Sequence, residues 1–210
     1  MKKIGILSQK GGVGKSSLTG LLATEYARAG WKVLIADMDV SQGSSVEWGS
    51  FRKENALAPR VDVASFNTLS EALQNSYDII LFDGAPHASE TTKEIAWLAD
   101  LTILPTGCSI MDLNPQIRLA HELVEGGLNA EKIYFVLNKV GNSKAENNEV
   151  INYLNQAGYM VCPGAIPEKT AFRKLFREGK SLSETTFKSL KKSCEEVVQA
   201  VVNRINELTK

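Results

Sequence analysis

The chain contains little of what marks secreted or membrane-spanning proteins. Only three cysteines occur in 210 residues, and their wide spacing forms neither a metal-binding pattern nor an even set of disulfide partners. We therefore expect Cys108, Cys162 and Cys194 to be reduced, buried thiols in a cytoplasmic protein. No stretch approaches the roughly 20 apolar residues that a membrane-spanning helix needs, and the N-terminus lacks the layout of a signal peptide.

A net charge, internal repeats, low-complexity tracts and linkers are also missing. Lys and Arg number 24 and balance 24 Asp and Glu, and 43% of the residues are hydrophobic. This composition suits a globular protein that buries its core without disulfides, and we expect one domain over residues 1–210. The charge is nevertheless uneven, because residues 169–192 contain eight basic and two acidic side chains. That segment carries +6 and the rest of the chain carries −6.

Apolar, β-branched runs alternate with segments of helical spacing along the chain. Continuous apolar strands separated by helices predict an α/β fold, a doubly wound, mostly parallel sheet with helices on both faces. Ligands of such sheets bind beyond the carboxyl ends of the strands, so we expect the chemistry in the residues that follow each run. The expected strands are Ile4–Leu7, Lys32–Ala36, Val61–Phe66, Ile79–Phe82, Leu101–Leu104, Ile133–Leu137 and Tyr159–Cys162.

The most specific motif is a glycine-rich turn between the first run and a helical pattern that starts near Ser16. Glycines allow backbone N–H groups to approach phosphate oxygens, and the N-terminus of the following helix adds partial positive charge. Lys15 is placed to reach the β- and γ-phosphates of a nucleotide, and the Ser16 hydroxyl to coordinate Mg²⁺. The strict pattern G-x-x-x-x-G-K-[ST] fails, because Gln9 replaces its first glycine and Lys10 adds a second lysine. The nucleotide-binding residues expected in this turn are Lys10, Gly11, Gly12, Val13, Gly14, Lys15, Ser16 and Ser17.

Carboxylates follow the second and fourth expected strands. Asp37 and Asp39 are spaced to point the same way, toward a magnesium–phosphate centre. Four apolar residues end in Asp83, which matches a Walker B aspartate that holds Mg²⁺ through water. His87 has no evident partner and is expected to be a solvated loop side chain, whereas His121 lies in a helical stretch and is expected to be structural.

The glycine-rich turn resembles the deviant phosphate loop K-G-G-x-G-K-[ST]-[ST] of the ParA/MinD-type ATPases, and every fixed position is matched. The resemblance implies a P-loop NTPase of the deviant Walker A class that hydrolyses ATP with Mg²⁺. It implies that Lys10 reaches the nucleotide of a partner subunit across a homodimer interface. It also implies that Asp39 orients the attacking water or the water shell of the metal. The expected catalytic residues are then Lys10, Lys15 and Asp39. The residues expected to bind the metal, directly or through water, are Ser16, Asp39 and Asp83.

The chain departs from the family pattern at the second expected strand end. The family carries D-x-D-P-Q there as its first switch, whereas Val40 and Ser41 replace the single proline here. Gln42 is therefore displaced by one residue, which puts the geometry of this loop and the rate of hydrolysis in question.

Two later stretches resemble nucleotide-binding elements of the family. Asn138 stands where the family often places a polar side chain against adenine, and an amide can both donate to and accept from the polar edge of the base. Residues 166–169, which include Pro167, resemble the loop whose backbone completes the adenine pocket. Asp112 falls near the family's dimer interface and receives no role from the sequence.

The segment of charge +6 suggests contact with nucleic acid. Lys and Arg supply sequence-independent, salt-sensitive affinity for the DNA backbone. In the ParA branch such residues bind the nucleoid in the ATP-bound dimer, so the resemblance implies a nucleoid-associated protein. A solvated basic surface without a ligand is the alternative. The candidates for duplex DNA are Arg173, Lys174 and Arg177 in one group and Lys188, Lys191 and Lys192 in another.

The resemblance as a whole predicts a small ParA-type ATPase that partitions DNA or cargo, with hydrolysis stimulated by a centromere-binding or cargo adaptor protein. A MinD-like membrane-associated positioning ATPase and a metabolic enzyme of the same fold, such as an amide-forming synthetase or an electron donor, stay open. A membrane anchor would need an amphipathic C-terminal helix. The apolar stripe of residues 190–208 is mostly valine, and the opposite face carries Glu195, Glu196 and Glu207. We expect this helix to pack on the core.

Overall fold

The computed structural model describes residues 1–210 except 75, 87 and 88, so the expectation for His87 lies outside the described residues. The strands are β1 (Lys2–Ser8), β2 (Val33–Asp37), β3 (Asp62–Ser65), β4 (Ile79–Pro86), β5 (Leu101–Thr106), β6 (Ile133–Val140) and β7 (Met160–Pro167). The helices are α1 (Lys15–Arg28), α2 (Ser44–Glu54), α3 (Leu69–Leu73), α4 (Glu90–Leu98), α5 (Ile110–Glu125), α6 (Lys144–Gln156), α7 (Thr170–Arg177) and α8 (Lys188–Leu208). Two short 3₁₀ turns are η1 (Ala130–Lys132) and η2 (Leu182–Glu184).

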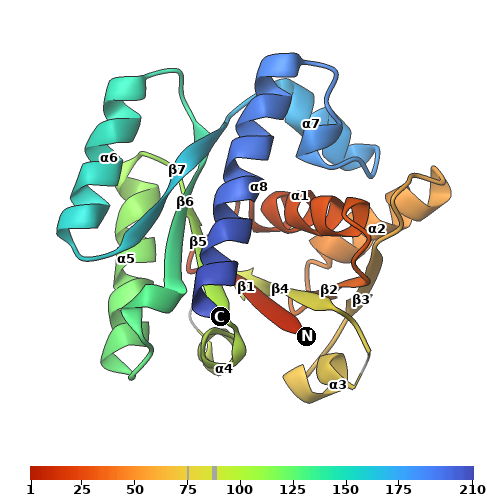
Figure 1. Cartoon of the computed structure of the whole chain (residues 1–210), viewed down its shortest axis with the longest axis horizontal. Helices are drawn as coiled ribbons and strands as arrows, with labels where there is room; N and C mark the ends of the chain where they lie inside the picture. The colour runs from red at the N-terminus through yellow and green to blue at the C-terminus, as the bar shows by residue number, and fades with distance from the viewer. Residues whose placement is uncertain (75, 87–88) are drawn as a thin grey trace.

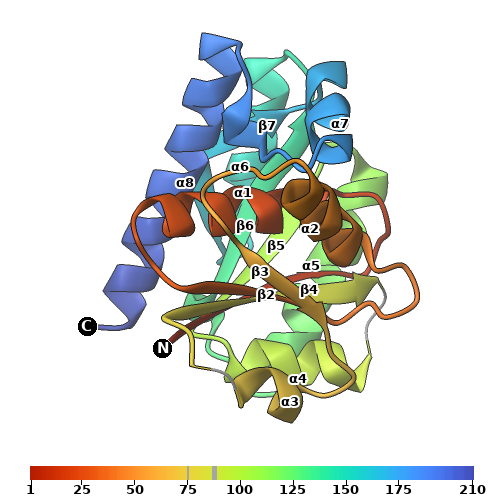
Figure 2. The same cartoon turned by 90° about the vertical axis from the view of Figure 1, so that its right-hand side faces the viewer.

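The strands form one sheet in the order β3-β2-β4-β1-β5-β6-β7, and each pair of neighbours runs parallel. Helices α1, α2, α7 and α8 cover one face, and α3, α4, α5 and α6 cover the other (Figures 1 and 2). The predicted doubly wound α/β fold is confirmed, and the sheet is parallel throughout the part of the chain that the structure describes.

Two hydrophobic cores lie on the two faces of the sheet. Successive side chains of a strand point to opposite faces. In β2, Val33 and Ile35 therefore enter one core, while Leu34 and Ala36 enter the other. Because both faces are buried, the strands appear in the sequence as continuous apolar runs.

The C-terminal helix α8 packs on the sheet, as its apolar stripe predicted. Cys194, Val197, Val201 and Ile205 are fully buried in the core that contains α1. Among the described residues, no helix combines the length and the apolar character that crossing a bilayer requires. The cysteines are free thiols, but Cys108 is only half-buried, which corrects the expectation that all three are buried.

Two segments that were expected to follow strands belong to the strands themselves. Asn138 lies inside β6, and Pro167 ends β7. After a shift in register, Asn138 pairs with Ile166 and Val140 with Pro167, so the ladder continues beyond the apolar runs. A proline is tolerated there because β7 is an edge strand of the sheet.

A buried arginine joins α2 to the segment between α7 and α8. The Arg52 side chain is 3% exposed, and its Nη1 lies 2.8 Å from Oε2 of Glu184. Arg52 also donates to the carbonyls of Gly179 (3.0 Å) and Pro59 (3.0 and 3.1 Å), so its guanidinium is extensively hydrogen-bonded. The indole of Trp48 stacks under it with 5.5 Å between the ring centroid and the guanidinium carbon.

We predict that Arg52→Ala lowers the free energy of unfolding by about 3 kcal/mol, because it leaves Glu184 and two carbonyls without their buried donor. Urea denaturation measures this change. Arg60→Ala is the matched control, since the Arg60 side chain is 91% exposed and its ion pair with Asp62 contributes less than about 1 kcal/mol. Equal losses in the two variants would contradict the structural role of Arg52.

Candidate functional site

The glycine-rich turn joins β1 to α1 and leaves the start of α1 open to a ligand. Gly14 precedes the helix in the left-handed region (φ 90°), and a Cβ at this residue would lie 2.3 Å from Nδ2 of Asn138. No side chain caps the helix, and its first turn contains no acidic residue. The backbone N–H groups of this turn are therefore available to an anion.

A cavity of about 220 Å³ lies against this helix start. It is lined by Gly11, Gly12, Gly14, Lys15, Ser16, Ser17, Asp37, Asp39, Gln42, Ser44, Asp83, Gly84, Lys139 and Phe176. All residues expected in the phosphate-binding turn except Lys10 and Val13 thus line one cavity together with both aspartate-bearing strand ends, at the carboxyl edge of the sheet. Burial lowers the pKa of Lys15, while the charges of Asp83, Asp39 and Asp37 oppose that shift.

The N-terminus of α2 holds the two buried carboxylates of the cavity. The backbone N–H groups of Ser45 and Val46 donate to Oδ2 of Asp37 at 2.9 and 3.1 Å. The Ser45 hydroxyl donates to Oδ2 of Asp83 at 2.7 Å. Sequence reasoning missed Ser45, although its place at the start of a helical segment directly after Asp37–Gly43 was a signal for such a contact.

The residues around Asp83 fit a magnesium ion. Oδ1 of Asp83 is buried and has no hydrogen-bond partner among the described residues, and Ser16 lies beside the same carboxylate. Burial raises the pKa of Asp83 to about 6, while the nearby Ser16 hydroxyl, the hydrogen bond from Ser45 and the charge of Lys15 oppose the shift. An unpartnered carboxylate oxygen next to a serine hydroxyl suits a hydrated cation that takes its other ligands from water and phosphate. No group of three His, Cys, Asp or Glu side chains in the described chain forms an alternative metal site.

Asp39 lies at the rim of the cavity in a turn formed by the inserted residues. Its Oδ1 accepts hydrogen bonds from the Ser41 hydroxyl (2.7 Å) and from the Gln42 backbone N–H (3.1 Å). Gly43 N–H donates to the Asp39 carbonyl (2.8 Å), which closes the turn before α2. The insertion therefore leaves Asp39 and Gln42 at the cavity and provides the Asp39 carboxylate with a local partner.

Lys10 points away from the cavity that its neighbours line. Its ammonium group forms an ion pair with Asp112 at the start of α5, and Asp112 also accepts from the Ser109 hydroxyl (2.8 Å). These hydrogen bonds and the charge of Lys10 hold the pKa of Asp112 below its usual value against the effect of burial. The Lys10 side chain is 41% exposed, so the pair lies at the surface of the molecule.

A second cavity, of about 270 Å³, continues from the first. Ser17, Lys139 and Phe176 line both, so the two spaces meet at these residues. Asn138 and Pro167 line the second cavity, where the sequence placed the base of the nucleotide. The amide of Asn138 is already engaged, because its Nδ2 donates to the Val13 carbonyl (2.7 Å) and holds the glycine-rich turn.

The basic residues are divided between this second cavity and the surface. Arg173 and Arg177 line the cavity, whereas the Lys174 side chain is 80% exposed and lies 3.7 Å from Glu178. Lys188, Lys191 and Lys192 start α8 at the same end of the molecule as α7 (Figure 1). Lys191 and Lys192 each lie 3.9 Å from a glutamate one turn later, Glu195 and Glu196.

Two functional candidates on the nucleotide side escaped the sequence analysis. Phe176 joins the two cavities from α7, and Lys139 reaches the Gly12 carbonyl from β6. Their signals were weak, because an aromatic residue in a basic helix and a lysine after an asparagine are common. His121 is structural as expected, since its Nδ1 lies 3.1 Å from the Tyr159 hydroxyl.

Comparison with solved structures gives the same fold at low sequence identity. A plasmid partition protein from Borrelia burgdorferi has a TM-score of 0.68 with 19% identity and covers 97% of this chain and 98% of that one. The septum site-determining protein MinD from Pyrococcus horikoshii, complexed with Mg-ADP, has a TM-score of 0.72 with 20% identity and covers 95% of each chain.

Sequence comparison gives a local match and a family match. The iron-sulfur cluster carrier protein of Clostridium perfringens is 43% identical over 53 residues, which are 25% of this chain and 19% of that protein. The matched part thus spans about a fifth of the longer relative. The family model of the CobQ/CobB/MinD/ParA nucleotide binding domain matches residues 4–182, which contain the loop, both aspartate-bearing strands and both cavities. The chain belongs to the CobQ/CobB/MinD/ParA family of nucleotide-binding domains.

Proposed function

We propose that this protein is a ParA-type ATPase that forms a dimer with ATP and Mg²⁺, binds duplex DNA without sequence preference, and releases it on hydrolysis. The observation that carries the proposal is the direction of Lys10. This lysine of the phosphate loop lies outside its own cavity and at the surface, on Asp112, which supports a role at the nucleotide of a second subunit.

Each of the two cavities binds a different part of ATP. The start of α1 and Lys15 hold the phosphates in the first cavity, and the base occupies the second, between Asn138 and Pro167. Ser16 and Asp83 hold Mg²⁺, which neutralises charge on the phosphates when it is bound. Asp39 orients the attacking water once its carboxylate is released from Ser41.

The surface around Lys10 supports an interface between two copies. Ile110 and Met111 lie beside Asp112 at the start of α5, and their exposed fractions are 71% and 75%. Exposed apolar side chains next to a surface ion pair are typical of a contact surface. Lys10 must leave Asp112 to reach a partner subunit, so dimer formation competes with this ion pair.

The DNA-binding role is favoured over the two alternatives by α8 and by the cysteines. The apolar stripe of α8 is buried against the sheet, so it offers no apolar face to a membrane. A cluster-bridging electron donor needs accessible cysteine ligands, but Cys162 and Cys194 are buried in the core, which leaves the half-buried Cys108 as the one remaining cysteine. An adaptor protein that speeds hydrolysis completes the proposed cycle.

The test of the proposed function is ATP-dependent binding to random duplex DNA over a salt series, read by fluorescence anisotropy. We expect binding with ATP and Mg²⁺ and no binding with ADP. The logarithm of the binding constant is expected to fall linearly with the logarithm of the salt concentration. Binding to anionic vesicles instead of DNA would support the MinD-like alternative. Binding to neither, with intact ATP hydrolysis, would support a metabolic enzyme.

We predict that Lys10→Ala leaves ATP binding by the monomer within about twofold of wild type but abolishes ATP-dependent dimers, because its charge is needed only across the interface. Light scattering after gel filtration measures the dimer. Asp112→Asn is the informative companion, since it frees Lys10 and is expected to dimerise at least as readily as wild type. Lys144→Ala, at an exposed site on α6, is the control. Unchanged dimers in Lys10→Ala would contradict the role in the partner subunit.

We predict that Asp39→Ala slows phosphate release by about 100-fold and prolongs the lifetime of the ATP-bound dimer, because the attacking water loses its orienting carboxylate. A phosphate-release assay measures this, with nucleotide affinity as a second readout. Ser41→Ala keeps the carboxylate and removes only its local donor, so it is expected to hydrolyse ATP at or above the wild-type rate. Wild-type turnover in Asp39→Ala would exclude this residue from catalysis.

We predict that replacing Lys188, Lys191 and Lys192 with alanine weakens DNA binding and reduces the salt slope by roughly 0.9 for each DNA phosphate that the protein no longer neutralises. These lysines do not line either nucleotide cavity, so ATP affinity is expected to stay unchanged. Lys174→Ala tests α7 without touching the base cavity that Arg173 and Arg177 line. An unchanged salt slope in both variants would show that the DNA-binding residues lie outside α7 and α8.

A further inference from the structure

The sheet ends in a strand with one unpaired edge. β3 is the first strand of the sheet and pairs only with β2 among the described strands. The Phe66 N–H donates to the Asp37 carbonyl of β2 at 3.1 Å. Backbone groups point alternately to the two sides of a strand, so Ala64 also faces β2, while the N–H and C=O groups of Val63 and Ser65 face outward. No hydrogen bond outside the ladder with β2 involves Val63 or Ser65 among the described residues.

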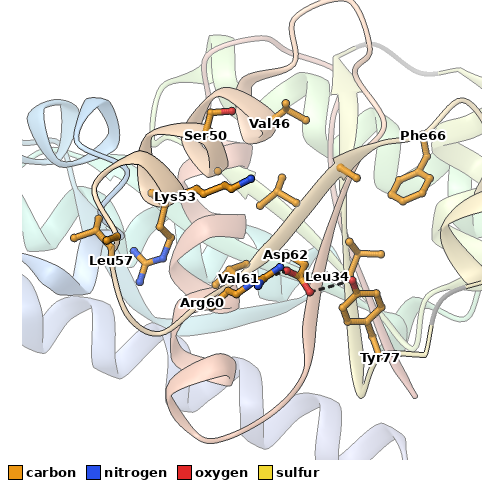
Figure 3. Close-up of a pocket in the computed structure, with 15 residues that line it drawn as sticks. Leu34, Val46, Ser50, Lys53, Leu57, Arg60, Val61, Asp62, Phe66 and Tyr77 are labelled. Carbon is orange, nitrogen blue, oxygen red and sulfur yellow. Dashed lines mark hydrogen bonds and ion pairs between the residues drawn. The ribbon is translucent and has the colours of Figure 1, made fainter.

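A cavity of about 900 Å³ runs along this free edge, and residues from both faces of the sheet line it. Val46, Ser50 and Lys53 of α2 lie on one side of the β3 ribbon, and Phe66 and Tyr77 lie on the other (Figure 3). The apolar cores agree with this picture, because Val63 packs against the core under α2, whereas Phe66 and Tyr77 pack against the opposite core. Space that straddles the edge of a strand has the shape that one more strand would fill.

The charges along the cavity favour an acidic occupant. Its lining contains the cations Arg52, Lys53 and Arg60 but a single carboxylate, Asp62. Arg52 is neutralised by Glu184, and Lys53 forms no ion pair among the described residues. Arg60 pairs with Asp62 at 3.0 Å, but its side chain is 91% exposed, so this pair yields readily to another carboxylate.

The same charges oppose pairing between two copies of this chain. Two β3 edges that met would bring Lys53 and Arg60 of one copy to the cations of the other. Like charges facing each other across a strand pair are destabilising. β3 is also only four residues long, so the few hydrogen bonds it offers would not offset this repulsion.

We propose that the free edge of β3 binds an extended acidic segment of a partner protein, which joins the sheet as an added strand. Main-chain hydrogen bonds to Val63 and Ser65 supply the pairing. Apolar side chains of the segment enter the cavity beside Val46 and Phe66, and its carboxylates reach Lys53 and Arg60. None of the residues that line this cavity lines the two nucleotide cavities, so an occupant here does not overlap the proposed ATPase site.

The test is selection from a random 12-residue peptide library on the full-length protein, with counter-selection against Ser65→Pro. Proline at this exposed position removes an outward N–H and leaves the ladder with β2 in place, as edge strands tolerate. Selected peptides are then synthesised with a fluorescent label and measured by anisotropy. Amide hydrogen exchange of Val63 and Ser65 is followed by NMR with and without peptide.

The expected peptides are acidic with alternating apolar residues, bind Ser65→Pro at least tenfold more weakly, and slow exchange of the Val63 and Ser65 amides. Lys53→Glu is a second variant that keeps the backbone intact and is expected to lose at least tenfold, whereas Lys144→Glu on α6 is expected to bind as wild type. ATP affinity and urea midpoints of all variants verify that they are folded.

Three results would overturn the proposal. One is enrichment of basic or neutral peptides, or the failure to obtain any peptide that binds wild type more tightly than Ser65→Pro. Another is equal binding to wild type and Lys53→Glu. The third is a nucleotide-independent dimer in sedimentation that Ser65→Pro abolishes, since it would assign the edge to a second copy of this chain.

Discussion

Two carboxylates, Asp37 and Asp83, are buried at the carboxyl edge of the sheet, and the rest of the site depends on how they are accommodated. Burying an ionised carboxylate costs on the order of several kcal/mol unless hydrogen bonds offset it. Asp37 accepts two N–H groups from the start of α2, and Asp83 accepts the Ser45 hydroxyl from the same turn. The other oxygen of Asp83 has no hydrogen-bond partner among the described residues and stays available to a ligand.

Contacts at both ends of α2 hold this helix in place. Its N-terminus binds the carboxylates, and Arg52 at its far end is held by Gly179 and Glu184. Trp48 in the middle donates to the Lys180 carbonyl at 3.1 Å and packs on Gly20 of α1. α2 therefore connects the cavity at the start of α1 with the segment after α7, whose Leu182 lines the second cavity. The outer side of the same helix forms one wall of the free β3 edge.

Much of the fold and of the phosphate site could be predicted because the signals are local. Buried parallel strands are continuous apolar runs, and a glycine-rich turn before a helix contains its own phosphate-binding geometry. Strand ends were predicted less well: β6 and β7 extend through Asn138 and Pro167 because their pairing continues after the apolar residues stop. The buried contacts of Arg52 were not predicted, since its partner Glu184 lies 132 positions away. The adenine and DNA contacts stay predictions.

The sequence by itself determined the sheet, the glycine-rich turn, and the aspartates that follow two strands, because each depends on neighbours along the chain. Only the tertiary structure decided what those groups contact. Lys10 meets Asp112 across 102 positions, and Ser45 meets Asp83 across 38. The open edge of β3 is likewise a property of strand order, which no run of residues encodes locally. Side-chain partners brought together by folding set where the lysine points, which carboxylate oxygen is free, and which strand lacks a neighbour.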